Sequence, residues 1–397
     1  MQSVNFVSKT NSWEQEKLGE CSKFYNGLTS VSKSDFGVGK DLYIDYLNVF
    51  NNTFSQFSEL KKFKNSSRQN YVQFKDVILT ISSETPDEVA MSSVINWKND
   101  YKNVAFNSFC ILVRFNQLEK YDVNYIGYFF RSNSFRTQAM LMAQGISRFN
   151  INQTALKKTL FLFPPNIYEQ QKIGNVLYYL DSLITLHQRK LSSLKNLKNR
   201  LLDRMFCDEK SQFPSIRFTE FTNAWEQGKL GNLIDKGGSG GTPNTSNAKF
   251  YNGSIPFLTI ADLTKADGHI YSTEKHITNE GLNSSSAWIV PKGSLTLSIY
   301  ATIGKIGIMH QNMATSQAFY SMVINDDITK KYLYYHLKKS DVFGEWTKLI
   351  STGTQANLNS EKVKSFGIFI PKNKSEQSKI SSLFTHLDSL ITLHQRG

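Results

Sequence analysis

The sequence contains few cysteines and no long apolar run, and both absences narrow what the protein can be. Its three cysteines, Cys21, Cys110 and Cys207, are scattered and offer neither a disulfide framework nor the spacing of a zinc site. No segment reaches the roughly 18 consecutive apolar residues of a membrane span, and the N-terminus lacks the apolar core of a signal peptide. We therefore expect a cytoplasmic protein that does not cross a membrane.

Motifs for catalysis are also missing. The glycine-rich segment Gly237–Pro243 lacks the Lys-Ser/Thr ending of a phosphate-binding loop, and no G-x-G-x-x-G sequence opens a dinucleotide or methyl-donor site. The order of Phe163-Pro-Pro-Asn166 is wrong for an amino-methyltransferase, and no Cys/His cluster predicts a metal site. Carboxylates beside lysine at 208–210 and 274–275 could belong to a nuclease, although surface charge explains them as well. The sequence therefore predicts neither cofactor nor metal in this chain and favours recognition.

What the chain does contain is positive charge and aromatic residues. Lysine and arginine total 46 against 33 acidic residues, a net charge of +13, and there are 28 phenylalanines and 18 tyrosines in 397 residues. This balance favours a polyanionic partner, with nucleic acid first and an anionic membrane surface second. A basic protein with no nucleic-acid role is the plainer alternative. The aromatic content suits strand-rich domains and also the stacking of bases.

A long internal repeat organises the chain. The decapeptide LDSLITLHQR occurs at 180–189 and again at 387–396. Other segments recur with an offset between 207 and 212 residues, and these are Asn11–Glu20 with Asn223–Asn232, and Glu169–Ile173 with Glu376–Ile380. The sequence therefore predicts a duplicated unit, each copy a globular segment followed by a helix.

Each globular segment is predicted to be α+β, with a mixed or antiparallel sheet and helices. Short β-branched and aromatic runs bounded by Gly, Asn, Asp and Pro predict strands at Tyr71–Phe74, Val77–Ile81, Phe109–Phe115, Ser294–Tyr300, Ile303–Met309 and Phe319–Ile324. Amphipathic patterns predict helices at Val123–Arg131 and Lys331–Lys339.

The helix predicted for Tyr168–Met205 has an apolar seam with 4–3 spacing, so it must pack against another helix. The seam positions are Ile173, Leu177, Leu180, Ile184, His187, Leu191, Leu194, Lys198, Leu201 and Met205. The obvious partner is its own copy after Pro371, with seam residues Ile380, Phe384, Leu387 and Ile391. His187 and Lys198 either set the register or extend to the solvent at the helix edge. Because the second copy stops at Gly397, we expect Leu191–Met205 to be partly unpaired or paired with another chain.

These motifs resemble the specificity subunit of type I restriction–modification systems over essentially the whole chain. The resemblance rests on Trp-Glu-Gln-x-Lys-Leu-Gly opening each copy, on Gly-x-Thr-Pro at Gly240–Pro243, and on the Glu-Gln-x-Lys-Ile segment before each leucine-rich helix. The first copy lacks Gly-x-Thr-Pro and has Asn26–Ser30 in its place. The globular segments differ almost throughout, which indicates two dissimilar half-sites and therefore an asymmetric target.

The resemblance implies two target-recognition domains in tandem, each reading one half of a bipartite DNA sequence, and long helices that pair as an antiparallel coiled coil and set the gap. It further implies docking of two modification subunits, which bind S-adenosylmethionine and methylate adenine, and of restriction subunits, which use ATP and Mg. The chain itself would be non-catalytic. The expected divisions are residues 1–164 (first domain), 165–207 (spacer helix), 208–224 (linker), 225–371 (second domain) and 372–397 (distal helix).

Polar residues of the loops are the candidates for DNA contact. Arginine and lysine suit guanine or phosphate, and asparagine and glutamine suit adenine; ordinary solvated loop residues are the alternative for each. The candidates are Ser82, Ser83, Lys102, Asn107, Gln144, Arg148 and Asn150 in the first domain, and Ser239, Thr242, Asn244, Tyr300, Thr302, Lys305, Ser316, Gln317 and Gln355 in the second.

Two other functions stay open beside a DNA reader. A chain with a short distal helix could act mainly as an assembly or dimerisation scaffold. An autonomous methyltransferase or nuclease is the second alternative, and the missing motifs argue against it.

Overall fold

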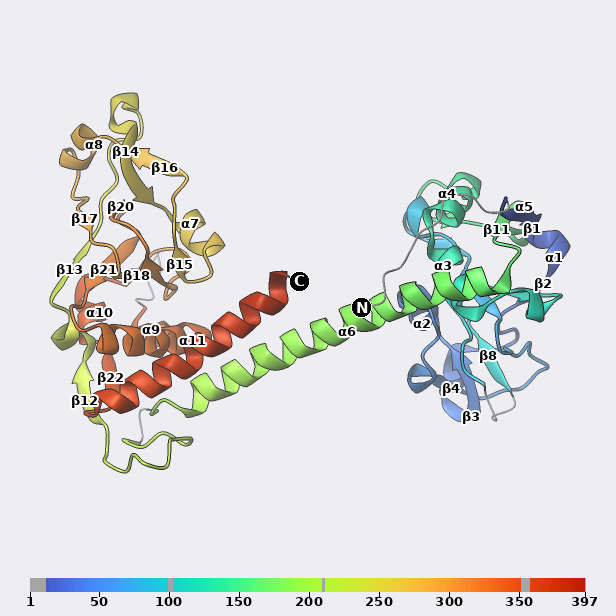
Figure 1. Ribbon diagram of the computed structural model, residues 1–397, viewed down its shortest axis with the longest axis horizontal. Helices are drawn as coiled ribbons and strands as arrows, with labels where there is room; N and C mark the ends of the chain where they lie inside the picture. The colour runs from blue at the N-terminus through green and yellow to red at the C-terminus, as the bar shows by residue number, and fades with distance from the viewer. Residues whose placement is uncertain (1–11, 99–102, 209–210, 351–357, 397) are drawn as a thin grey trace. The chain divides into compact units, whose positions relative to one another are not determined.

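The computed structural model describes residues 12–98, 103–208, 211–350 and 358–396. The chain forms two compact units, Met1–Thr185 and Leu186–Gly397. The division lies inside the 38-residue helix α6 (Ile167–Arg204), so each unit contains a part of this helix (Figure 1). Within the described ranges, no helix is long and apolar enough to cross a bilayer.

Unit 1 contains two main sheets. The order β2-β9-β5-β7 is antiparallel throughout, whereas in the order β4-β3-β8 the strands β3 and β8 run parallel. Strand pairs β1-β11 and β6-β10 complete the unit. The strands are β1 (Glu14–Lys17), β2 (Ser22–Asn26), β3 (Phe36–Ile44), β4 (Lys61–Phe63), β5 (Val77–Thr80), β6 (Ser82–Ser83), β7 (Ser92–Val94), β8 (Val104–Phe106), β9 (Cys110–Phe115), β10 (Phe149–Asn150) and β11 (Leu160–Phe163). The helices before α6 are α1 (Leu18–Cys21), α2 (Tyr46–Asn51), α3 (Val123–Arg131), α4 (Asn133–Met142) and α5 (Gln153–Lys158).

Unit 2 contains a five-stranded sheet, β13-β21-β18-β19-β15, and a four-stranded sheet, β16-β14-β20-β17. Each is mixed, because β15 runs parallel to β19 and β14 runs parallel to β20. The strands are β12 (Glu226–Lys229), β13 (Lys236–Ser239), β14 (Tyr251–Leu258), β15 (His269–Ile270), β16 (Lys275–Ile277), β17 (Ile289–Val290), β18 (Leu295–Ser298), β19 (Ile306–Met309), β20 (Met313–Thr315), β21 (Phe319–Val323) and β22 (Gly367–Ile370). The helices are α7 (Ile260–Lys265), α8 (Asn279–Asn283), α9 (Asp327–Val342), α10 (Ser360–Ser365) and α11 (Lys374–Arg396).

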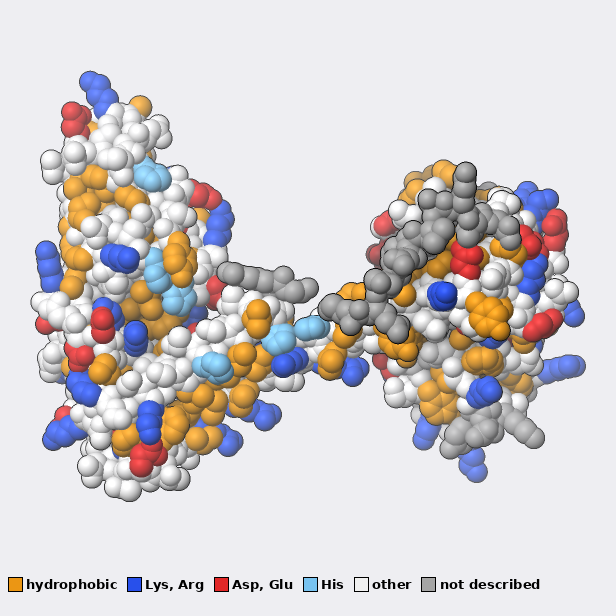
Figure 2. Space-filling model, in the orientation of Figure 1, with side chains coloured by type: hydrophobic (Ala, Val, Ile, Leu, Met, Phe, Trp, Pro, Cys, Tyr) orange, Lys and Arg blue, Asp and Glu red, His pale blue; other side chains and the backbone are white. Residues whose placement is uncertain are grey.

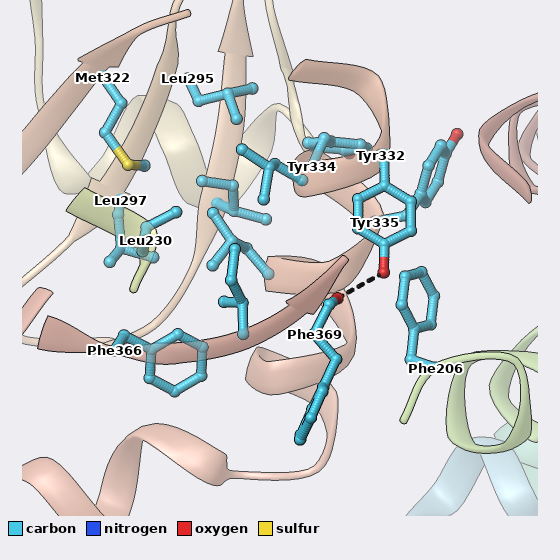
Figure 3. Close-up of a cluster of buried hydrophobic side chains, with 14 of the residues drawn as sticks. Phe206, Leu230, Leu295, Leu297, Met322, Tyr332, Tyr334, Tyr335, Phe366 and Phe369 are labelled. Carbon is cyan, nitrogen blue, oxygen red and sulfur yellow. Dashed lines mark hydrogen bonds between the residues drawn. The ribbon is translucent and has the colours of Figure 1, made fainter. Parts of the chain in front are cut away.

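The largest core lies in unit 2 and joins the five-stranded sheet to helices. Leu295 and Leu297 alternate with polar residues along β18, so one face of the strand meets the tyrosines of α9 (Figure 3). Tyr332 of α9 satisfies its buried hydroxyl by donating to the carbonyl of Phe369, at 2.8 Å. Leu202 of α6 belongs to the same core, so the end of this helix is held by unit 2.

Most predicted elements are confirmed, and one predicted strand is wrong. The helix at Val123–Arg131 is α3, and the other predicted runs overlap β5, β9, β18, β19, β21 and α9. Tyr71–Phe74 forms no strand. The backbone amide of Gln73 donates to the carboxylate of Asp76 at 2.6 Å, and Lys75 adopts a positive φ of 69°, so the chain turns where a strand would continue.

Both copies contain the same antiparallel strand pair and the same hydrogen bond from a tryptophan indole to a glutamate. Strand β1 pairs antiparallel with β11, and β12 pairs antiparallel with β22 in the matching register. The indole of Trp13 donates to Glu169 at 3.3 Å, and that of Trp225 donates to Glu376 at 3.1 Å. The repeated Trp-Glu-Gln and Glu-Gln motifs are therefore neighbours in space in each unit, although about 150 residues separate them in sequence.

Each copy also fixes its long helix to the helix before it by a tyrosine–aspartate bond. Tyr128 of α3 donates to Asp181 of α6 at 2.9 Å, and Tyr335 of α9 donates to Asp388 of α11 at 3.0 Å. The offset is 207 for both members of the pair. The duplication is therefore one of tertiary contacts as well as sequence.

Within unit 2, the second half of α6 and α11 pack antiparallel, which confirms the predicted pairing of the long helices. The ring nitrogens Nδ1 of His187 and His394 lie 3.2 Å apart, and Lys198 forms an ion pair with Asp388 further along. Both polar seam residues therefore join the two helices, as expected for residues that set a register. The tandem α+β fold with long antiparallel helices is the predicted fold class.

Candidate DNA-recognition surfaces

In unit 1, predicted DNA-contact residues gather where a short strand pair crosses the end of the main sheet. Ser82 and Ser83 form β6, and they pair antiparallel with Asn150 and Phe149 of β10. Both serines are buried, so they are not the solvent-facing loop residues that the sequence predicted. The backbone amide of Ile151 donates to Ile81 at 3.0 Å and continues this connection. The strand pair therefore brings together residues almost seventy positions apart, which the sequence pattern alone could not place.

Arg148 projects from a hairpin that the backbone holds closed. Gln144 and Asn150 exchange both backbone hydrogen bonds, at 2.9 and 2.8 Å. Gly145 between them has a φ of +144°, and a Cβ at this position would lie 1.9 Å from the carbonyl oxygen of Arg148. Only glycine fits this close approach, so the hairpin presents exposed Gln144, Arg148 and Asn150 in a defined conformation.

Asn107 has a local structural task at the neighbouring turn. Its side-chain oxygen accepts a hydrogen bond from the backbone amide of Phe109 at 2.8 Å. The backbone amide of Asn107 donates to the carbonyl oxygen of Ile44 at 2.9 Å. The carbonyl of Phe109 accepts from Ile81, so the turn lies beside β6. Lys102, also predicted for DNA contact, lies outside the described residues.

In unit 2, the glycine-rich segment is a close approach of two backbones. The amide of Gly241 donates to Thr315 at 3.0 Å, and a Cβ on Gly240 would lie 2.0 Å from the same carbonyl oxygen. Thr242 follows at the surface and donates to the side chain of Gln317. The segment is therefore no phosphate cradle but a fixed strap that places Thr242 and Gln317 together.

The remaining predicted residues of unit 2 lie at the ends of strands and on turns. Ser239 lies 3.1 Å from Ser360 through their hydroxyls. The turn after β18 is closed by the amide of Lys305, which donates to the hydroxyl of Ser298 at 3.0 Å. Exposed Tyr300 and Thr302 lie on this turn, Ser316 precedes Gln317, and Asn244 is exposed just after the strap. Gln355 lies outside the described residues.

The same frame is present in unit 1, and its threonine was not among the predicted DNA contacts. Leu28 donates to Phe106 at 2.9 Å as Gly241 does to Thr315, and a Cβ on Gly27 would lie 2.0 Å from the carbonyl oxygen of Asn107. Asn26–Ser30 therefore occupies the place of Ser239–Pro243, and Thr29 corresponds to Thr242. The signal was the shared Gly-x-Thr, which the missing proline obscured.

The described residues offer little for chemistry. They contain no group of three or more His, Cys, Asp or Glu that could hold a metal ion. Burial raises the pKa of the Cys21 and Cys207 thiols to about 12 and also raises that of Cys110, so none is a thiolate at neutral pH.

The apolar seam residues are buried along α11, but along α6 those after Ile173 are buried or half-buried only in its second half. On α11, Ile380, Phe384, Leu387 and Ile391 are buried. The predicted seam residues on their side of unit 2 are Leu191, Leu194 and Leu201 of α6 and Met205 just after it, and these are half-buried or buried. Leu191–Met205 was predicted to be partly unpaired or paired with another chain; in the structure this segment packs within unit 2, because antiparallel packing brings α11 to the second half of α6.

The first half of α6 is where apolar side chains remain exposed. Ile173 packs against the core of unit 1, but Leu177, Leu180 and Ile184 are exposed. Further apolar side chains lie at the surface along the α6–α11 pair, among them Leu393 (Figure 2). Leu177, Leu180 and Ile184 belong to the seam predicted to dock partner subunits, and their role in docking stays a prediction.

Comparison with known proteins gives one consistent match. A family model described as the type I restriction modification DNA specificity domain matches residues 10–196 and again residues 223–397. Similar proteins include the type I restriction enzyme MjaIX specificity subunit of Methanocaldococcus jannaschii, 30% identical over 184 residues, and the HindI specificity subunit of Haemophilus influenzae, 29% identical over 159 residues. The first alignment covers 46% of this chain and 42% of the relative, and the second covers 39% and 34%. The chain thus spans less than half the length of these relatives.

A solved structure matches over a greater length. The S subunit of a type I restriction–modification system from M. genitalium is similar over 98% of this chain and 93% of its own, with a TM-score of 0.57 and 13% sequence identity. At this identity the likeness is one of fold.

Proposed function

Because the chain belongs to the type I restriction–modification DNA specificity family, we propose that it is the DNA-reading subunit of such a system and recognises a bipartite, asymmetric target. The observation that carries the proposal is the shared recognition frame with different side chains. The Gly-x-Thr strap lies against the sheet in both units, but the buried Ser82 stands in unit 1 where unit 2 has the exposed Tyr300. Readers built alike with different contact residues select different half-sites.

The long helices act as the spacer between half-sites in this proposal. Helix α6 has 38 residues and therefore a length of roughly 57 Å. A rigid connection converts its length into a fixed number of unread base pairs, as the geometry of a dimer fixes the spacing of operator half-sites. The net charge of +13 supplies attraction to phosphates without sequence preference.

The chemistry is proposed to reside in partner subunits. Adenine methylation would be performed by modification subunits that bind S-adenosylmethionine, and cleavage by restriction subunits that use ATP and Mg. The chain would direct both by placing them on its target and would catalyse neither step.

The test is to map methylated adenines across the genome of a host that carries this chain with its modification subunit. A two-part motif with a fixed gap is expected, and purified complex should prefer that duplex in competition binding. A single contiguous palindrome, or no preference among duplexes, would reject the proposal.

The exposed apolar residues of α6 support a second function, that of an assembly scaffold. Leu177, Leu180 and Ile184 are apolar and exposed in the middle of α6, and such a stripe is typical of a protein contact. Light scattering of the chain alone and with the modification subunit distinguishes a dimer from a mixed complex. Leu180→Glu should weaken that contact, whereas Lys195→Glu, an exposed position on the paired half of α6, serves as a charge control.

A further inference from the structure

Unit 1 contains a hollow at the centre of its predicted DNA surface. Its volume is about 350 Å³. The lining includes Ser82 and Ser83 of β6, Arg148 of the hairpin, and two glutamates. The glutamates are Glu84 and Glu88, neither of which the sequence suggested as a DNA contact.

The hollow contains charged groups of both signs, and Glu84 and Arg148 do not form an ion pair with each other. Within the described residues, the side chains of Glu84 and Arg148 form neither a hydrogen bond nor an ion pair, and both residues are exposed. Glu88 is different, because it accepts a hydrogen bond from the hydroxyl of Ser83 at 2.9 Å. Glu84 and Arg148 are therefore available to a ligand, while Glu88 is held in the wall.

A free carboxylate on a DNA surface needs a specific reason. It repels phosphates, so it weakens the nonspecific attraction that lysine and arginine provide. It is favourable only where it accepts a hydrogen bond from a base, and among base edges in the major groove the cytosine N4 amino group is its usual donor. Arginine makes its commonest specific contact with O6 and N7 of guanine. A cytosine paired with guanine presents this donor and these acceptors side by side.

We infer that the hollow of unit 1 reads one G·C base pair in the major groove, with Glu84 accepting from cytosine N4 and Arg148 donating to guanine O6 and N7. This inference rests on the proposed DNA-reading function and names a pair of specificity-determining residues. It commits the half-site of unit 1 to at least one G·C pair.

The surroundings suit such a reading. The β6–β10 pair and the glycine-closed hairpin fix Arg148 relative to the strand that precedes Glu84. Tyr46 donates to the carbonyl of Ser82 at 2.8 Å and holds the floor of the hollow. Phe109 lines it and is 57% exposed, so an apolar side chain is available to contact a thymine methyl group at the neighbouring base pair.

The experiment compares the complete complex of wild-type and variant chains on duplexes in which each position of the unit 1 half-site is changed in turn. In Glu84→Gln, discrimination at one G·C pair should fall roughly five- to hundredfold, the range for loss of one good base contact. Arg148→Gln should relax the same position. The half-site read by unit 2 should stay unchanged in both variants.

The matched control is Glu119→Gln, since Glu119 is also an exposed acid of unit 1 but does not line the hollow. It should leave every position unchanged. The inference is overturned if Glu84→Gln changes no position, if it affects all sequences equally, if the relaxed position is an A·T pair, or if only assembly with the modification subunit changes. Failure of the proposed function is distinct, because the wild-type complex would then show no bipartite target at all.

Discussion

The two copies of LDSLITLHQR allow one sequence to be tested in two environments. Leu387 and Leu180 are the same residue of the identical decapeptide, and their side chains are 5% and 50% exposed. Replacement by alanine changes helix propensity equally at both sites and only slightly. Burial of a leucine contributes about 1.5–3 kcal/mol, and the cavity left by its removal adds to the loss. We therefore expect Leu387→Ala to cost about 2–4 kcal/mol and Leu180→Ala less than about 1 kcal/mol.

The assay is native-state hydrogen exchange of the full chain, because it reports on each unit separately where a single unfolding curve would not. Protection of the α9 and α11 amides should fall by roughly thirtyfold or more in Leu387→Ala. Protection of the α3 amides and of the unit 1 part of α6 should stay near the wild-type value in Leu180→Ala. Ile391→Val and Ile184→Val form a second matched pair, with a smaller difference of the same sign. Equal losses at Leu180 and Leu387 in the chain alone would refute the burial that the fold assigns to them.

Two further outcomes concern unit 2. Burial lowers the pKa of His336 to about 4, and its Nδ1 has no hydrogen-bond partner within the described residues. The unfolded chain binds a proton at this histidine below about pH 6.5. The contribution of neutral His336 to the free energy of unfolding is therefore fully present above that pH and is lost as the pH falls toward 4, by an amount on the order of 3 kcal/mol. The urea midpoint of unit 2, measured against pH, should show this loss of stability in acid. His336→Phe introduces the residue found at the equivalent position of the first copy, Phe129, and should reduce the loss. An unchanged dependence on acid pH in this variant would contradict the role of His336. Gly240→Ala should destabilise unit 2 by about 1–3 kcal/mol, since the added Cβ would lie 2.0 Å from the Thr315 carbonyl oxygen. Gly228→Ala is the control, because a Cβ there meets no atom within 4 Å and should leave the melting temperature unchanged. Equal melting temperatures of the two variants in thermal unfolding would contradict the close approach at Gly240.

Sequence reasoning succeeded where signals were local or repeated. Periodicity located Val123–Arg131 as a helix, and α6 begins and ends within one residue of its predicted bounds. It failed at Tyr71–Phe74, where an aspartate side chain takes the amide that a strand would use. Glu84 was passed over because acidic residues do not suggest a DNA contact, and only the fold shows that Glu84 lines the same hollow as Arg148.

The sequence by itself determined the duplication, the fold class and the family, because repeated motifs and apolar periodicity are written in consecutive residues. It also fixed which helix face is apolar. Only the tertiary structure decided which copy of that face is buried, since Leu180 and Leu387 begin the same decapeptide but have different neighbours in space. The physical reason is direction. In an antiparallel pair, α11 runs back along the end of α6 that belongs to its own unit, so Leu191–Met205 packs there, whereas Leu177, Leu180 and Ile184 are exposed.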